Sequence, residues 1–200
     1  MSSLTRIVAW GHDLIREVLS PGDLAVDLTA GKGRDTLVLA EAVGPTGQVV
    51  AFDKQAVALT QTSALLQQYG YRVKKWPGDR EIPAGNEIVL VQTCHSSLQK
   101  LLTSPVRAVI ANLGYLPGGD RRLITCPEST LPALTQSLDL LSIGGRLAVT
   151  VYPAHPGGME EAQMIDDFFA CLPSDLWQVL SMRVANRGDA PCLLVAERRR

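Results

Sequence analysis

The sequence lacks the features that mark secreted, membrane-spanning and metal-bound proteins. Its first twenty residues mix charged with apolar side chains, which argues against a secretory signal, and no run reaches the roughly eighteen apolar residues of a membrane span. The cysteines, Cys94, Cys126, Cys171 and Cys192, form no C-x-x-C pair and have no neighbouring histidine at metal-ligand spacing. We therefore expect a cytoplasmic protein with reduced thiols, no membrane contact and no bound metal.

An excess of positive charge is also missing. Nineteen Lys and Arg residues stand against twenty Asp and Glu residues, and the formal net charge is −1. Because proteins that bind nucleic acid mainly through its phosphates carry a basic excess, any RNA contact of this chain must be local. The candidate basic clusters are Arg72, Lys74, Lys75 and Arg80, then Arg121 and Arg122, then Arg198, Arg199 and Arg200.

The 200 residues, 46% of them hydrophobic, suffice for one sizeable core but not for two, so we predict a single domain over residues 1–200. Strand and helix patterns alternate, which predicts a mostly parallel sheet with helices on both faces and an antiparallel hairpin at the C-terminus. The predicted strands are 24–28, 48–52, 87–92, 107–112, 145–152, 177–184 and 192–197. The predicted helices are 4–19, 35–43, 55–69, 96–103, 130–141 and 159–171. Residues 71–86 are interpreted as a connection, although 71–76 could form a short strand.

A glycine turn stands between the first predicted strand and the helix that follows. Residues 27–36 read Asp-Leu-Thr-Ala-Gly-Lys-Gly-Arg-Asp-Thr. Gly31 and Gly33 allow the backbone to approach a ligand closely, and the free amides of the next helix point toward it. A dinucleotide-binding turn needs a third glycine at position 36, where this chain has Thr36, so nicotinamide and flavin dinucleotides are disfavoured.

A second acidic residue supports a nucleoside cofactor. Asp53 ends the second predicted strand, where a carboxylate can accept hydrogen bonds from both hydroxyls of a ribose. Asp27, at the start of the glycine turn, either orders that turn or meets the amino end of the cofactor. His95, which follows the third predicted strand, either caps the next helix or lies near the site.

The pattern D-x-T-x-G-x-G resembles the first motif of class I S-adenosylmethionine-dependent methyltransferases, with Thr29 at the position of the first glycine. The resemblance implies a Rossmann-like α/β fold with seven strands and S-adenosylmethionine as the cofactor. Thr93 and Cys94 replace the acidic residue that such enzymes often place near the adenine. The implied cofactor site contains Asp27, Thr29, Ala30, Gly31, Lys32, Gly33, Asp35, Thr36, Asp53, Lys54, Thr93, Cys94, His95 and Asn112.

A second motif, Asn-Leu-Gly-Tyr at residues 112–115, follows the fourth predicted strand. It resembles the Asn-Pro-Pro-Tyr tetrapeptide of amine-directed methyltransferases, in which the Asn side-chain oxygen accepts a hydrogen bond from the target amine. Because the carboxyl ends of parallel strands share one sheet edge, both motifs should meet there. The implied catalytic residues are Asn112 and Tyr115. Asp120 and His155 are candidates for accepting a proton from an alkylamine.

Together, residues 27–36, residues 112–120 with 124–125 after them, and residues 151–158 resemble the family of putative rRNA methylases, which is linked with tRNA methyltransferases acting on the wobble uridine. Lys32, the pair Thr93-Cys94 and Cys126 depart from the family pattern. The resemblance implies N-methylation of 5-aminomethyl-(2-thio)uridine in the anticodon region of tRNA, with a homodimer left open. An rRNA substrate, a small-molecule amine and a non-catalytic binding module are the alternatives.

Overall fold

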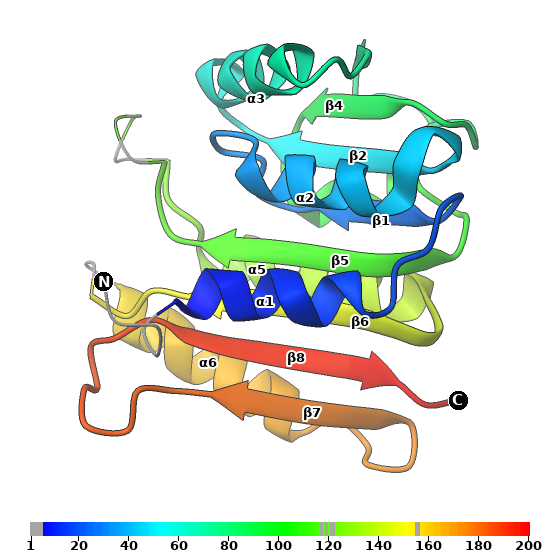
Figure 1. Cartoon of the computed structure of the whole chain (residues 1–200). Helices are drawn as coiled ribbons and strands as arrows, with labels where there is room; N and C mark the ends of the chain where they lie inside the picture. The colour runs from blue at the N-terminus through cyan, green and yellow to red at the C-terminus, as the bar shows by residue number, and fades with distance from the viewer. Residues whose placement is uncertain (1–5, 117, 119, 121–122, 155–156) are drawn as a thin grey trace.

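Figure 1 shows the computed structural model of the chain, which describes residues 6–116, 118, 120, 123–154 and 157–200. Helices and strands alternate along most of it. The strands are β1 (Leu24–Asp27), β2 (Gln48–Asp53), β3 (Val73–Trp76), β4 (Ile88–Gln92), β5 (Val106–Leu113), β6 (Leu141–Val151), β7 (Trp177–Met182) and β8 (Cys192–Arg198). The helices are α1 (Ile7–Arg16), α2 (Arg34–Val43), α3 (Ala56–Gln68), α4 (Leu98–Leu101), α5 (Pro127–Leu140) and α6 (Gly158–Ala170).

The strands form one twisted sheet in the order β3-β4-β2-β1-β5-β6-β8-β7. Neighbours from β3 to β6 run parallel, and β8 lies antiparallel between β6 and β7. The predicted α/β fold with a C-terminal antiparallel hairpin is therefore confirmed. The described residues contain eight strands, one more than the sequence predicted.

Two hydrophobic layers hold the helices against the two faces of the sheet. Successive strand residues alternate between the layers, so Val26 packs in one and its neighbour Ala25 in the other. Leu98 of α4, Leu134 of α5 and Phe169 of α6 belong to the first layer. Ile15 of α1, Leu39 of α2 and Leu66 of α3 belong to the second. Because both faces are covered, the central strands are apolar throughout, as parallel sheets require.

The additional strand is β3, which lies in the segment predicted to be a connection. It pairs in parallel with β4, and Val73 lies opposite Ile88. Lys74 and Lys75 are exposed, and lysines are typical of an edge strand, where they hinder pairing with other chains. Only the two ends of β3, Val73 and Trp76, pack against the hydrophobic layers. With two lysines between them, the segment lacks the apolar pattern that predicts a strand.

Two predicted boundaries on the C-terminal half of the sheet were also wrong. The helix expected at 130–141 begins at Pro127, because a proline is favourable at the first helical position, where its missing amide costs nothing. Pro132, which the predicted range placed in the first turn of the helix, therefore lies inside α5. Strand β6 begins at Leu141, four residues before the predicted start, with a register shift opposite Val106 and Ala108.

The arrangement positions a ligand site at one edge of the sheet. β1 and β5 are neighbours at its centre, and the chain leaves β1 toward β2 but leaves β5 toward β6, on the opposite side. Ligands of open parallel sheets bind outside the carboxyl ends of the strands at such a reversal. No helix in the described ranges is both long and apolar enough to cross a membrane.

Candidate active site

A cavity of about 790 Å³ opens at this reversal. Its walls come from the glycine turn after β1, the ends of β2, β4 and β5, and the N-terminal end of α1. The volume is within the range of small-molecule and cofactor sites. Of the predicted site residues, the cavity is lined by Thr29, Ala30, Gly31, Lys32, Asp35, Asp53, Lys54, Thr93, His95, Asn112 and Tyr115.

The glycine turn is held in place by hydrogen bonds to Asp27 and by close packing against α3. Asp27 is fully buried and accepts hydrogen bonds from the Thr29 amide at 2.9 Å and from Thr36 Oγ1 at 2.6 Å. Gly33 has a φ of +81°, and a Cβ there would lie 2.8 Å from the Thr62 Cα of α3. Asp27, Gly33 and Thr36 are thus the supports of the turn and are not among the residues lining the cavity.

Burial makes Asp27 an unusual carboxyl group. Loss of solvent, reinforced by the nearby carboxylate of Asp35, raises the pKa of Asp27 to about 7, although its hydrogen bonds with Thr36 and Thr29 oppose the rise. A cationic ligand in the cavity would favour the ionised form of Asp27.

Asp53 lies at the end of β2, beside the glycine turn. Its carboxylate accepts hydrogen bonds from the Gly31 amide at 3.0 Å and from the Gln55 amide at 2.8 Å. Partial burial raises the pKa of Asp53, and these amide hydrogen bonds oppose the rise. The side chain lines the cavity, as a ribose-binding residue must, and that role remains a prediction.

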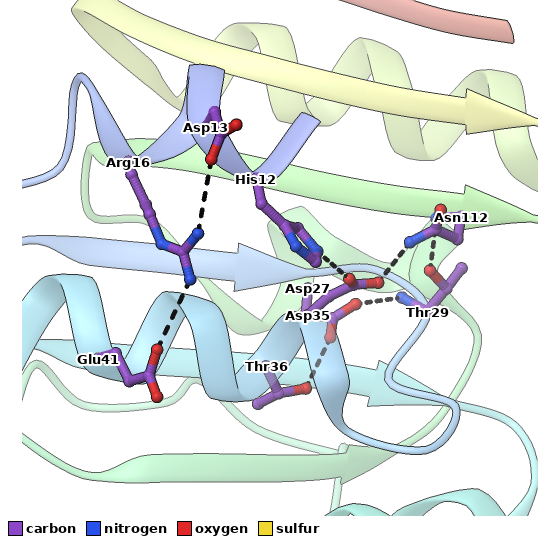
Figure 2. Close-up of polar contacts among 9 residues, drawn as sticks. All are labelled: His12, Asp13, Arg16, Asp27, Thr29, Asp35, Thr36, Glu41 and Asn112. Atoms are coloured by element: carbon purple, nitrogen blue, oxygen red, sulfur yellow. Dashed lines mark hydrogen bonds and ion pairs between the residues drawn. The ribbon is translucent and has the colours of Figure 1, made fainter. Parts of the chain in front are cut away.

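Asn112, at the end of β5, is fixed by two contacts (Figure 2). Its backbone amide donates to Thr29 Oγ1 at 2.8 Å, and its side-chain Nδ2 donates to Asp35. Because a carboxylate only accepts hydrogen bonds, this contact determines which end of the Asn112 amide is the nitrogen. The other end, Oδ1, is therefore an acceptor, and it is buried without a partner among the described residues.

His12 of α1 completes this chain of contacts and was not predicted as a site residue. Its Nε2 lies 2.5 Å from Asp35 Oδ1, so Asp35 contacts both His12 and Asn112 (Figure 2). His12 lies between Val8 and Ile15 on the face of α1 that packs inward. A polar residue on an otherwise apolar helix face was the signal that could have identified it.

His95 presents a second unpartnered acceptor. Its Nδ1 lies 3.2 Å from the carbonyl oxygen of Leu28, so Nδ1 carries the proton and Nε2 has a free lone pair. Burial lowers the pKa of His95, which keeps the ring neutral. Among the described residues, His95 Nε2 and Asn112 Oδ1 are the buried side-chain N and O atoms without a partner, and both residues line this cavity.

The loop at residues 112–125 is closed at its base by Thr125. The Gly114 amide donates to Thr125 Oγ1 at 2.8 Å, and that hydroxyl donates to Glu161 Oε2 at 2.9 Å. Glu161 is buried, and sequence reasoning missed it because its partners are distant in the chain. Tyr115 lines the cavity and is 41% exposed, leaving ring surface available to a second ligand.

Other predicted residues lie elsewhere. Cys94 does not line the cavity although Thr93 and His95 on either side of it do, and Asp120 is also outside the lining. His155 lies outside the described residues. No three His, Cys, Asp or Glu side chains in the described ranges could hold a metal ion together.

The strand order, the glycine turn and the acidic residue at the end of β2 define a fold of the class I methyltransferase type. The chain belongs to the putative rRNA methylase family, whose model matches residues 49–198. The family predicted from the sequence motifs is thereby confirmed.

Two solved structures extend the likeness over almost the whole chain. A putative rRNA methylase from Clostridium thermocellum is 31% identical, with 96% of this chain and 97% of that chain covered and a TM-score of 0.86. A putative methyltransferase from Streptococcus mutans, crystallised in complex with SAH, is 32% identical, with 96% and 98% covered and a TM-score of 0.80. Both support the fold assigned above.

A curated plant protein is also similar. The chain is 36% identical over 190 residues to the chloroplastic tRNA (mnm(5)s(2)U34)-methyltransferase of Arabidopsis thaliana. The match covers 92% of this chain but 66% of the plant protein, so this chain spans just under two thirds of that relative.

Proposed function

We propose that the protein is an S-adenosylmethionine-dependent N-methyltransferase that methylates the aminomethyl group of 5-aminomethyl-(2-thio)uridine at the wobble position of tRNA. The product is 5-methylaminomethyl-(2-thio)uridine. The methyltransferase class is supported by the family and by the SAH-bound Streptococcus relative. The observation that supports an amine as the substrate is the buried Oδ1 of Asn112, which has no partner among the described residues. The contact of Asn112 Nδ2 with Asp35 fixes this oxygen as an acceptor beside the glycine turn.

The volume of the cavity and the hydrogen-bonding groups of its lining suit S-adenosylmethionine. Asp53 offers carboxylate oxygens to a ribose, and His95 Nε2 is a neutral acceptor suited to the amino group of adenine. Gly31, with a φ of +53°, places the backbone of the turn at the cavity wall. The cofactor supplies an electrophilic methyl group on a sulfonium.

The residues of the chain contribute by orienting the amine and not by covalent chemistry. Asn112 Oδ1 accepts a hydrogen bond from the N–H of the substrate, which directs the nitrogen lone pair toward the cofactor side of the cavity. The Tyr115 ring packs beside the nucleobase. Because only an uncharged nitrogen attacks, the amine must lose one proton, and Asp120, His155 and water are the candidate acceptors. In-line transfer of this kind depends chiefly on positioning.

The decisive test is a methyl-transfer assay with purified protein, S-adenosylmethionine, and tRNA that either carries or lacks the aminomethyl group. We expect methylation of the aminomethylated tRNA alone. In parallel, nucleoside mass spectrometry of tRNA from a deletion strain should show the unmethylated aminomethyl nucleoside accumulating. An unchanged nucleoside profile would contradict the proposal.

The same assay separates the alternatives. The family description leaves rRNA as a second candidate substrate, so purified rRNA is included as an acceptor. A small-molecule amine would be methylated without any RNA present. A protein that binds neither S-adenosylmethionine nor SAH in calorimetry would be a non-catalytic module. We place the reaction in the cytoplasm, although the Arabidopsis relative is named as chloroplastic.

A further inference from the structure

Four exposed cations border the cavity, namely Arg6, Lys32, Arg34 and Lys54. Lys54 interacts with the thiol of Cys94. The other three form no ion pair or side-chain hydrogen bond with any residue that the structure describes. The acids of the same lining, Asp35 and Asp53, have other partners. Asp35 contacts His12 and Asn112, and Asp53 accepts two backbone amides. With four cations against these two carboxylates, the lining carries an excess of positive charge, within a chain whose net charge is −1.

Two of these cations stand where a helix disfavours positive charge. Arg6 is the N-cap residue of α1, and Arg34 is the first residue of α2. The N-terminus of a helix carries about half a positive charge of its own, so a cation there is unfavourable and an anion is attracted. Helix dipoles and side chains thus add to one positive potential at the cavity mouth.

The cofactor does not account for this charge. S-adenosylmethionine has no phosphate and a single carboxylate, and its sulfonium and ammonium groups are cations. A free small-molecule amine, which is a cation near neutral pH, would be repelled by the same residues. A polyanion that carries the amine would be attracted.

We propose that Arg6, Lys32 and Arg34, here called the cation rim, bind backbone phosphates of the RNA strand that delivers the target nucleoside to the cavity. This inference rests on the proposed function in that RNA is the substrate. The glycine turn explains the position of Lys32. Gly31 and Gly33, on either side of Lys32, both have positive φ, and the tight turn that they form places Lys32 at the cavity wall. RNA phosphates at the rim leave the nucleobase free to enter beside Asn112.

Two other basic clusters lie in the described part of the chain, and neither lines the cavity. In the C-terminal one, Arg198 donates to the carbonyl oxygen of Leu141 and Arg199 to that of Ser174. The β3 cluster is partly paired. In the β3 cluster, Lys74 pairs with Glu87 at 3.0 Å, and Lys74 and Arg80 both lie over the Trp76 ring, at 5.4 and 5.1 Å from its centroid. Arg72 and Lys75 are its exposed residues without such contacts, and neither lines the cavity. They provide a matched control pair of equal charge.

The test measures binding of an anticodon stem-loop with an unmodified wobble uridine, by filter binding from about 50 to 200 mM salt. The rim variant Arg6→Gln/Arg34→Gln is compared with Arg72→Gln/Lys75→Gln and with wild type. Each phosphate contact in single-stranded RNA contributes about 0.7 to the slope of log affinity against log salt, so the rim variant should lose about 1.4 of slope. Its affinity at low salt should fall roughly tenfold, and the control pair should stay close to wild type.

Further measurements distinguish charge from structure. The rim variant should bind SAH like wild type and should unfold at the same or a slightly higher urea concentration, because unfavourable charges leave two helix N-termini. Arg6→Lys/Arg34→Lys should retain most of the RNA affinity. Unchanged RNA binding by the rim variant, an equal loss in the control pair, or a wild type that binds SAH but no RNA would each overturn the proposal.

Failure of the proposed reaction would look different. The stem-loop lacks the aminomethyl group, so its binding does not depend on which amine is methylated. Suppose that wild type binds the stem-loop through the cation rim but does not methylate aminomethylated tRNA. The proposed reaction would then be refuted, whereas the proposal that the cation rim binds RNA phosphates would be supported.

Discussion

Asp35, in the first turn of α2, accepts a hydrogen bond from the side-chain amide of Asn112, 77 residues later in the chain. This contact joins the first turn of α2 to the carboxyl end of β5. His12 holds the other oxygen of Asp35 at 2.5 Å. The orientation of the Asn112 side chain, the acceptor that we propose for the substrate amine, is thus set by Asp35 and His12.

We predict that Asp35→Asn lowers kcat for methyl transfer by roughly 10- to 100-fold, the scale of a lost positioning contact. An asparagine at position 35 can donate or accept, so the Asn112 amide is no longer held with Oδ1 toward the cavity. Steady-state kinetics should show the effect in kcat more than in the KM for tRNA. His12→Asn should act in the same direction and more weakly.

A neighbouring ion pair provides the control for Asp35→Asn. Arg16 and Glu41 also link α1 to α2, at 3.6 Å and outside the cavity (Figure 2). Glu41→Gln should leave kcat unchanged. Equal losses of kcat in Glu41→Gln and Asp35→Asn would show that Asp35 only holds the two helices together.

Asn112→Ala should abolish most methyl transfer while the cofactor still binds. The variant removes the acceptor for the amine, and loss of one such polar group in an active site costs roughly 100- to 1,000-fold in kcat. Single-turnover methylation of aminomethylated tRNA measures the loss, and calorimetry measures SAH affinity. Asn186→Ala, an exposed site on the β7–β8 connection, is the control. Normal turnover by Asn112→Ala would contradict the assigned role.

Asp53→Asn should weaken S-adenosylmethionine binding by roughly 10- to 100-fold, the effect of losing one hydrogen bond to a charged group. Calorimetric titration would measure the dissociation constant. Asp23→Asn is matched, because Asp23 also accepts a backbone amide, that of Ser20 at 2.7 Å, but lies outside the cavity. A similar loss of affinity in both variants would mean that Asp53 only orders its own loop.

Gly33→Ala should destabilise the fold more than Gly70→Ala does. Both glycines have a φ near +80°, which costs an alanine about 1–2 kcal/mol. A Cβ at Gly70 meets nothing within 4 Å, whereas one at Gly33 lies 2.8 Å from the Thr62 backbone. Urea unfolding of the two variants measures the difference, which isolates the close packing of the glycine turn against α3. Equal destabilisation would refute that packing.

The pKa of Asp27 predicts a pH dependence of stability. In the unfolded chain this carboxyl loses its proton near 3.8, whereas burial and Asp35 keep it protonated up to about pH 7 in the folded chain. The unfolded state then binds fewer protons, so the free energy of unfolding falls as the pH rises through this interval. The raised pKa of Asp53 acts in the same direction.

Asp27→Asn should reduce that slope. The variant loses hydrogen bonds from Thr29 and Thr36 and is less stable at every pH, so the slope and not the absolute stability is compared. Urea unfolding between pH 3.8 and 7 measures the slope of the free energy of unfolding against pH. Parallel curves for wild type and variant would mean that Asp27 is ionised throughout.

Local sequence patterns predicted the parts of the molecule that depend on neighbouring residues. The glycine turn could be predicted because residues 27–36 carry its glycines, its supporting Asp27 and the helix start together. Asn112 could be placed at the same edge because parallel strands end together. Strand β3 was missed because it has only two partly buried side chains, Val73 and Trp76, and its pairing with β4 is a tertiary contact.

The contacts between distant segments could not be predicted in this way. His12 and Glu161 each lie on a helix whose register against the sheet determines what they meet, and neither has a local motif. The 2.5 Å contact of His12 with Asp35 joins residues 23 positions apart, and Glu161 reaches Thr125 across 36. A single sequence contains no information on such pairs beyond the polarity of one position on an apolar face.

The packing of α1, the helix that carries His12, has a consequence for synthesis on the ribosome. Helix α1 packs against β8, where Gly11 faces Leu193, with no room for a larger side chain unless Leu193 shifts. The helix that supplies His12 therefore gains its full support only after β8 has been made. A nascent chain that contains both motifs but not yet β8 still lacks a packed α1, so we expect its cavity to be complete only once β8 joins the sheet.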